Sequence, residues 1–173
     1  YIIERAVRKP KRIVLPEANH YKILKAAQVM YDEGIAKPVL LGNEQKLLRL
    51  LEEYDIDKEG LEIVDPDKER EMRHMFTTQY FERRQRRGAT IIEANRMMRS
   101  RDFFGTMMVQ NGYADGLVTG LTKGYNTAIR PTLEVIGMEP GVPTFAGLYI
   151  MNTRHGVFFF ADCTINKDPD VDR

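Results

Sequence analysis

The chain has 173 residues with a formal net charge of +1, which is the size of one domain or slightly more. Its 43% hydrophobic content excludes intrinsic disorder, and 26 basic against 25 acidic residues give no global field for nucleic acid. No apolar run approaches the ~18 residues of a membrane span, and one cysteine excludes a disulfide framework, so we expect a cytoplasmic protein that binds neither nucleic acid nor membrane.

Short apolar runs alternate with segments of helical spacing along most of the chain. In chain order, the predicted elements are a strand at 13–15, a helix over 23–31, a strand at 38–42, a helix over 44–54, a strand at 61–64, a helix from 65 to about 88, a helix from 91, a helix over 102–112, a strand at 117–118 and a helix over 128–136. Asn43, Thr90 and Asp65 are the predicted N-caps, with Pro66 in the first turn after Asp65. This alternation predicts a three-layer α/β/α fold with a mostly parallel sheet.

The pattern changes after Gly137. Two strand-like runs, 145–151 and 157–161, predict an antiparallel hairpin. We therefore expect an α/β subdomain over 1–139 and the start of a second subdomain over 140–173. The unbroken apolar run 157–160 predicts a strand that is buried on both faces. Because so little chain remains to cover it, and because the chain opens on Tyr1, we expect a piece of something longer.

A glycine-rich stretch at 116–126 follows the last predicted strand of the first subdomain. Ligands of doubly wound folds bind at this position, and glycines allow close backbone approach to an anion at a helix N-terminus. The spacing matches neither a phosphate-binding loop with Gly-Lys-Ser/Thr nor a dinucleotide fingerprint. A plain tight turn is the alternative interpretation.

Basic side chains are the other candidate ligand groups. Seven arginines lie between residues 83 and 101, namely Arg83, Arg84, Arg86, Arg87, Arg96, Arg99 and Arg101. Guanidinium groups suit phosphate and carboxylate, although cations are also typical of a solvated helix C-terminus. Arg130, next to Pro131, is predicted to lie close to the ligand position of the glycine-rich loop, or else to be an ordinary surface arginine. Asp162, at the end of a strand, is a further candidate, whereas the three histidines are too far apart for a metal site.

Six stretches together resemble the phosphate acetyl/butyryltransferase family, in the order of that family and along nearly the whole chain. They are 11–17 (KRIVLPE), 34–42 (GIAKPVLLG), 105–109 (GTMMV), 114–120 (ADGLVTG), 130–131 (RP) and 161–166 (ADCTIN). The resemblance implies an α/β/α fold in two subdomains, akin to isocitrate dehydrogenase, in which the second subdomain dimerises. It also implies a ligand site for acetyl-CoA or phosphate that includes Arg84, Arg87, Thr119, Gly120, Tyr125, Arg130, Asp162 and Asn166.

A more specific resemblance is to the C-terminal domain of bacterial hybrid, NADP-dependent malic enzymes. It is carried by 103–108 (FFGTMM), 124–125 (GY) and 147–151 (GLYIM). In those enzymes the domain is implied to sense acetyl-CoA and to hold the oligomer together, while NADP, the divalent metal and malate decarboxylation belong to other domains. The chain departs from acyltransferases at 122–125 (TKGY), where they carry a His-Ser/Thr-Thr-like segment, and their catalytic Ser-Arg pair and Asp lie beyond this chain.

Two hypotheses follow. The first is an acetyl-CoA-sensing and oligomerisation domain of an NADP-dependent malic enzyme, with no catalytic residue in this chain. The alternative is part of an active phosphate acetyl- or butyryltransferase, and a purely structural domain is a third possibility.

Overall fold

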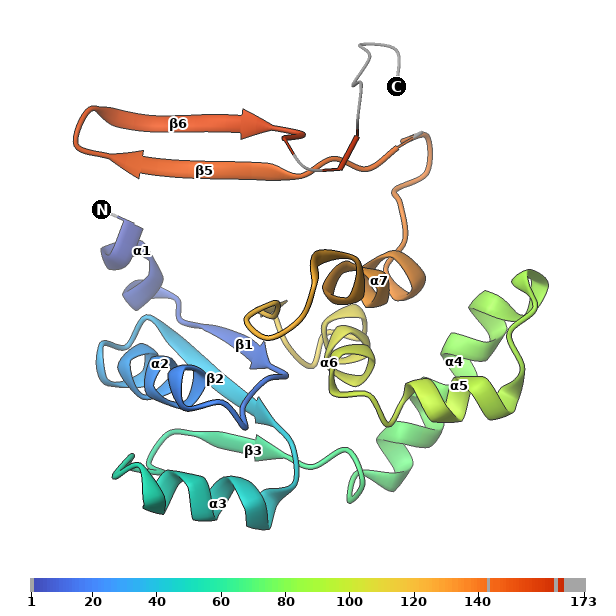
Figure 1. The fold of residues 1–173 in the computed structure, drawn as a ribbon, viewed down its shortest axis with the longest axis horizontal. Helices are drawn as coiled ribbons and strands as arrows, with labels where there is room; N and C mark the ends of the chain where they lie inside the picture. The colour runs from blue at the N-terminus through green and yellow to red at the C-terminus, as the bar shows by residue number, and fades with distance from the viewer. Residues whose placement is uncertain (1, 143, 164, 167–173) are drawn as a thin grey trace. The chain divides into compact units, whose positions relative to one another are not determined.

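A computed structural model describes residues 2–142, 144–163, 165 and 166 (Figure 1). The chain divides into two compact units, residues 1–136 and residues 137–173. The division falls at the end of the helix that follows the glycine-rich loop. Assignment of the second unit as a dimerising subdomain remains a prediction.

The first unit alternates strands and helices. Its elements are α1 (Ile2–Arg8), β1 (Lys11–Leu15), α2 (Tyr21–Asp32), β2 (Ala36–Leu41), α3 (Glu44–Glu53), β3 (Glu62–Val64), α4 (Arg70–Arg84), the 3-10 turn η1 (Gln85–Arg87), α5 (Ile91–Met97), α6 (Arg101–Gln110), β4 (Gly116–Leu117) and α7 (Tyr125–Val135). The four strands form one parallel sheet in the order β3-β2-β1-β4. The predicted α/β fold with a mostly parallel sheet is therefore confirmed.

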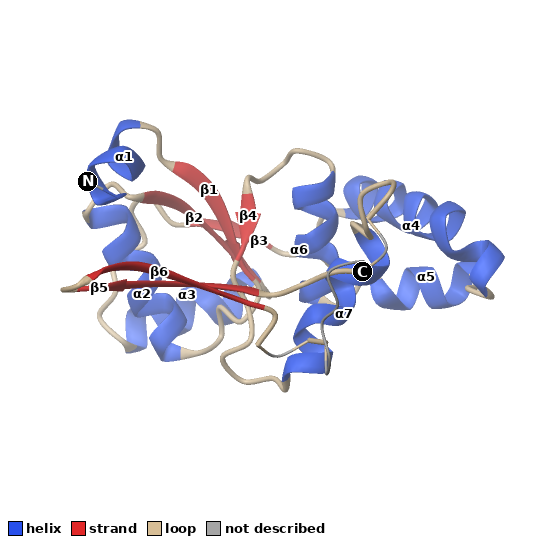
Figure 2. Cartoon of the chain, turned by 90° about the horizontal axis from the view of Figure 1, so that it is seen from above, coloured by secondary structure: helices blue, strands red, loops and turns tan. Residues whose placement is uncertain are grey.

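Alternate residues of each strand point to opposite faces of the sheet, and helices cover both faces. On one face, Val14 and Val39 pack with Phe76 and Phe104, which come from α4 and α6. The other face carries Leu15 and Leu40, which pack with residues of α2 and α3. Figure 2 shows α2 and α3 at one side of the strands and α4, α5 and α6 at the other. Two separate apolar cores thus hold the central layer.

Local capping was predicted correctly at two helices and wrongly at a third. Asn43 caps α3 by accepting a hydrogen bond from the backbone of Lys46, and Thr90 forms the expected capping box at the start of α5. Asp65 does not cap α4, which begins only at Arg70. Its carboxylate instead accepts the backbone N–H of Glu44 at 3.2 Å, so it neutralises the start of α3 from the end of a neighbouring strand.

Two helices differ from the sequence expectation. The helix α1 was not predicted, and α7 begins at Tyr125 rather than near 128. Pro131 therefore lies in the second turn of α7. The helix accommodates it although a proline removes one backbone donor.

The second unit contains the predicted hairpin. Strands β5 (Leu148–Thr153) and β6 (Gly156–Ala161) pair antiparallel, with Tyr149 opposite Phe160. The expectation that the run 157–160 is buried on both faces is wrong for this structure, since its side chains are 47–65% exposed. Two paired strands cover only each other's edges, so burial of their faces requires a further layer.

Candidate functional site

The sheet order places a crevice at the carboxyl ends of β1 and β4. From β1 the chain continues to β2 on one side, whereas β4 pairs with β1 on the other side. This reversal of direction is where ligands bind in open α/β sheets. The segment after β1 and the glycine-rich loop after β4 meet there.

Glu17 connects the segment after β1 to the glycine-rich loop after β4. Its side chain is 2% exposed, and its carboxylate accepts the backbone N–H groups of Gly120, Leu121 and Thr122, each at 2.8 Å. The hydroxyl of Thr122 donates to the same carboxylate, and that of Thr119 lies 3.4 Å from it. The glycine-rich loop is therefore wrapped around a carboxylate of the protein itself.

The hydrogen bonds keep this buried carboxylate charged. Burial by itself raises the pKa of Glu17, but the hydroxyl and backbone N–H of Thr122, with the N–H groups of Leu121 and Gly120, outweigh burial and lower the pKa to about 2. At neutral pH Glu17 thus carries a full negative charge. The loop amides that the sequence analysis offered to a ligand anion are bonded to Glu17 in this structure.

A second carboxylate anchors the same loop. Asp102, buried at the start of α6, accepts the hydroxyl of Thr119 at 3.0 Å and pairs with the ammonium group of Lys123. Neither Glu17 nor Asp102 was among the site residues predicted from the sequence. A signal for Glu17 was present, because it is an acidic residue just beyond a strand, as Asp162 is.

A pocket of about 550 Å³ lies between the loop and one face of α7. We call it the loop pocket, and its lining consists of Leu117, Val118, Thr119, Gly120, Lys123, Tyr125, Ala128, Ile129 and Thr132. Three predicted site residues, Thr119, Gly120 and Tyr125, therefore share one cavity. Among the described residues that line it, Lys123 is the charged one, and Asp102 neutralises that charge.

Two other predicted residues meet in what we call the arginine cluster. Arg130 of α7 donates to Glu134 at 2.7 Å, and Arg84 at the end of α4 lies 3.8 Å from the same carboxylate oxygen. The Tyr80 hydroxyl donates to the other oxygen of Glu134 at 2.6 Å. The side chain of Glu134 is 13% exposed, whereas that of Arg130 is 57% exposed and reaches solvent.

The charges of the arginine cluster are set by its contacts. Burial raises the pKa of Glu134, but hydrogen bonds from Tyr80 and Arg130 and the charges of both arginines outweigh it and lower the pKa below its usual value. Burial and the neighbouring Glu134 raise the pKa of Tyr80 to about 12. At neutral pH the cluster therefore holds two guanidinium cations, one carboxylate and a protonated phenol.

The loop pocket and the arginine cluster use different faces of α7. Positions 125, 128, 129 and 132, which line the loop pocket, recur at helical spacing on one face. Arg130 and Glu134 lie one turn apart on the opposite face. The structure thus brings Arg84 to Arg130, and Thr119 and Gly120 to Tyr125. Of the two alternatives for Arg130, a place beside the glycine-rich loop or the surface, the structure has its side chain exposed and outside the loop pocket.

The remaining predicted residues are Arg87 in the first unit and Asp162 and Asn166 in the second unit. Arg87 is exposed in the turn η1. In the second unit, Asp162 accepts the backbone N–H of Asn166 at 3.2 Å, and the Asn166 amide also donates to Phe145. The pairing of Asp162 with Asn166 organises the end of β6 within that unit.

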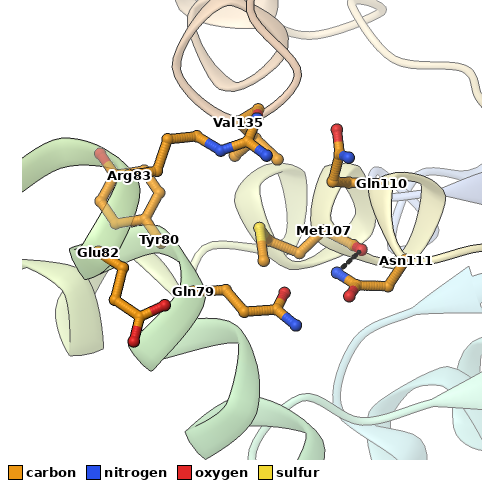
Figure 3. Close-up of a pocket in the computed structure, with 8 residues that line it drawn as sticks. All are labelled: Gln79, Tyr80, Glu82, Arg83, Met107, Gln110, Asn111 and Val135. Atoms are coloured by element: carbon orange, nitrogen blue, oxygen red, sulfur yellow. Dashed lines mark hydrogen bonds between the residues drawn. The ribbon is translucent and has the colours of Figure 1, made fainter.

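A further pocket of about 440 Å³ lies between α4, α6 and the end of α7 (Figure 3). Arg83 donates there to the carbonyl oxygens of Val135 and Ile136, which are C-terminal carbonyls of α7. Cations satisfy helix C-termini in this way. For Arg83, the structural interpretation of the arginine-rich segment is therefore the one that the contacts support.

Within the described part of the chain, no helix is long and apolar enough to cross a membrane. Among the same residues, no group of three or more His, Cys, Asp or Glu side chains is placed to hold a metal ion.

These features define the class of protein: an open, parallel α/β domain with buried charged groups, Glu17 and Asp102, that hold the loop at the carboxyl edge of its sheet. The sequence profile described as "Phosphate acetyl/butaryl transferase" matches residues 1–173. The chain belongs to this family.

Curated relatives agree with the family. The chain is 37% identical over 177 residues to a phosphate acetyltransferase of Thermoanaerobacterium thermosaccharolyticum and 35% identical over 178 residues to one of Acetivibrio thermocellus. Both matches cover 99% of this chain and 53% of the relative. The chain therefore spans about half the length of these relatives.

Solved structures show the same fold. The EutD phosphotransacetylase from Staphylococcus aureus aligns with a TM-score of 0.83 at 29% identity, covering 97% of this chain and 53% of that one. A phosphotransacetylase from Streptococcus pyogenes aligns with a TM-score of 0.82 at 30% identity, covering 97% of this chain and 51% of that one.

The malic enzyme prediction is wrong, and so is the oxidoreductase function attached to it, because these relatives are phosphate acetyltransferases. The expectation of NADP and a divalent metal in other domains has no support from them. The physical reason lies in the stretch 103–108, which forms the buried helix α6. A Cβ at Gly105 would lie 2.9 Å from side-chain atoms of Val14 and Leu117. Such residues determine how a helix packs, and packing does not specify a reaction.

Proposed function

We propose that the protein carrying this chain is a phosphate acyltransferase, which moves an acetyl or butyryl group between CoA and inorganic phosphate. The observation that carries the proposal is the arginine cluster. Arg84 and Arg130 come from different helices and lie within 4 Å of one carboxylate, with Arg130 open to solvent. Family membership supplies the acyl and phosphate chemistry.

The reaction needs charge stabilisation more than covalent help from the protein. A phosphate oxygen attacks the thioester carbonyl carbon and forms a C–O bond, and the carbonyl oxygen becomes an oxyanion. Collapse of this intermediate breaks the C–S bond, and the leaving thiolate takes up a proton to give CoA and an acyl phosphate. Preorganised cations at the phosphate and the oxyanion lower this barrier.

The arginine cluster has the groups for that role. Guanidinium forks bind phosphate oxygens through two parallel hydrogen bonds. Glu134 and Tyr80 hold the two arginines in place, and an arriving phosphate exchanges with Glu134 as the partner of Arg130. We assign anion binding to Arg84 and Arg130, and we keep Arg87, Thr119, Gly120, Tyr125, Asp162 and Asn166 as proposed contacts of acyl-CoA.

Two expectations about the whole protein belong to the same proposal. We expect a homo-oligomer, because the apolar faces of the hairpin β5–β6 are exposed in this chain. We also expect a cytoplasmic enzyme, since a single cysteine provides no internal disulfide.

The test is an acyl-transfer assay on the full natural protein that contains this sequence. Acetyl phosphate and CoA are supplied, and thioester formation is followed by its ultraviolet absorbance. We expect turnover by the wild type and a loss of about 10²-fold or more in kcat/KM for Arg84→Ala and Arg130→Ala. Arg49→Ala removes an exposed arginine of α3, on the other side of the sheet, and serves as the matched control with unchanged activity. An inactive wild type, with both acetyl and butyryl substrates, would overturn the proposal.

A further inference from the structure

Glu17 is a buried carboxylate that the proposed acyl transfer does not use. It lies just beyond β1, and its partners belong to the glycine-rich loop, more than 100 residues further along the chain. Three consecutive backbone N–H groups at 2.8 Å point to one carboxylate. This arrangement of amides is an anion receptor of the kind that binds phosphate in other proteins.

In this chain the carboxylate of Glu17 itself occupies the anion receptor. Burial of a carboxylate is costly unless hydrogen bonds replace its water, and here backbone amides and the hydroxyl of Thr122 do so. The turn itself needs a glycine, because Gly120 has a φ of 105°, which residues with a Cβ rarely adopt. The carboxylate of Glu17 accepts all three amides of this turn, so none of the three is vacant.

The same loop forms a wall of the loop pocket. Thr119, Gly120 and Lys123 line the pocket, and all three are tied to Glu17 or Asp102. A displacement of the loop therefore changes the shape of the pocket directly. The arginine cluster lies on the opposite face of α7, where Arg84 and Arg130 pair with Glu134.

We propose that Glu17 is a positioning residue that fixes the loop 119–123 in the shape required to bind CoA. This inference rests on the proposed function for the identity of the ligand. With its amides filled and Lys123 neutralised, the loop presents an uncharged wall, so the contact it offers is to the neutral part of CoA rather than to its phosphates.

The experiment uses the full natural protein and the substitution Glu17→Gln. A glutamine has nearly the same shape, but it is neutral and turns an NH₂ group toward backbone donors. We expect the KM for CoA to rise by about ten-fold or more with a smaller change in kcat, since a misplacement of about 1 Å is enough to cost 10²-fold. Hydrogen exchange of the amides of Gly120, Leu121 and Thr122 is expected to accelerate.

Two further variants make the result specific. Glu17→Asp keeps the charge on a shorter side chain, and we expect it to restore part of the CoA affinity. Asp115→Asn is the matched control, because Asp115 also accepts a backbone N–H, that of Arg12, but at the amino end of β4. We expect its KM and its loop exchange to equal those of the wild type.

Each outcome decides the inference. If Glu17→Gln lowers only the melting temperature, and the KM of the folded enzyme stays at the wild-type value, Glu17 has a structural role alone and the proposal is overturned. Wild-type exchange at the three amides overturns it as well. An inactive wild type refutes the proposed acyl transfer instead, and CoA binding by calorimetry then decides: loss of CoA binding on Glu17→Gln supports the inference, and an equal or absent affinity in both proteins overturns it.

Discussion

Two carboxylates of this chain, Glu17 and Glu134, stay ionised for different physical reasons. Burial raises the pKa of both, and hydrogen bonds lower it by more. The partners of Glu17 are backbone amides and hydroxyls, which are neutral dipoles fixed by the loop. Glu134 is held by a phenol and two guanidinium cations. The contacts of Glu17 fix the conformation of the glycine-rich loop. The contacts of Glu134 hold two arginines that, under the proposed function, bind phosphate.

Among the substitutions that test this comparison, Glu17→Ala is expected to have the largest effect on stability. It leaves three amides without their acceptor, and we expect the free energy of unfolding to fall by about 3 kcal/mol, even with some replacement by water. Urea denaturation of the full protein measures the change. A loss below about 1 kcal/mol would show that solvent serves the loop equally well.

The pH dependence of the free energy of unfolding tests the ionisation of Glu17. The folded pKa of Glu17 is about 2, against an ordinary value of 4.5. Between these values the unfolded state binds the proton and the folded state does not, so stability falls as the pH is lowered through this window. Glu17→Gln is expected to remove this contribution. Denaturation curves at several acidic pH values, for wild type and variant, provide the comparison, and identical slopes would contradict the assignment.

Removing the charge of Glu134 tests how strongly this carboxylate acts on its neighbours in the arginine cluster. Because the pKa of Tyr80 is raised first by burial and then by Glu134, we expect Glu134→Gln to lower that pKa from about 12 toward its ordinary value of 10.0 while burial keeps it above. Alkaline titration of tyrosinate absorbance, with Tyr80→Phe to identify the signal, measures the shift. An unchanged titration would mean that burial alone sets the pKa.

The smallest effect is expected for Tyr80→Phe. It removes one hydrogen bond to Glu134, and both arginines remain to balance the carboxylate. We expect a loss of about 1 kcal/mol in the free energy of unfolding. Thermal unfolding provides the measurement, and a loss as large as that of Glu17→Ala would erase the distinction between the two environments.

The sequence predicted local structure well where the cause was local. The caps Asn43 and Thr90 act on residues three positions away, so their pattern is readable in the chain. The prediction for Asp65 was wrong because one carboxylate oxygen of Asp65 accepts the nearby N–H of Asp67, while the other accepts the N–H of Glu44, on a helix that only packing brings to it. The site residues divide in the same way. Arg130 and Glu134 are four positions apart on one helix, a spacing that is visible in the sequence, whereas no local pattern shows that Arg84 reaches the same carboxylate.

By itself, the sequence determined the alternation of strands and helices, the parallel sheet with two buried faces and the hairpin, because periodicity and capping act over a few residues. The family followed from the resemblance of six sequence stretches and from the profile match. Only the tertiary structure decided that Glu17 fills the amides of the glycine-rich loop, and that α7 separates the loop pocket from the arginine cluster. Contacts between residues more than 100 positions apart depend on the order of strands in the sheet. That order follows from the packing of the whole core, and no short pattern encodes it.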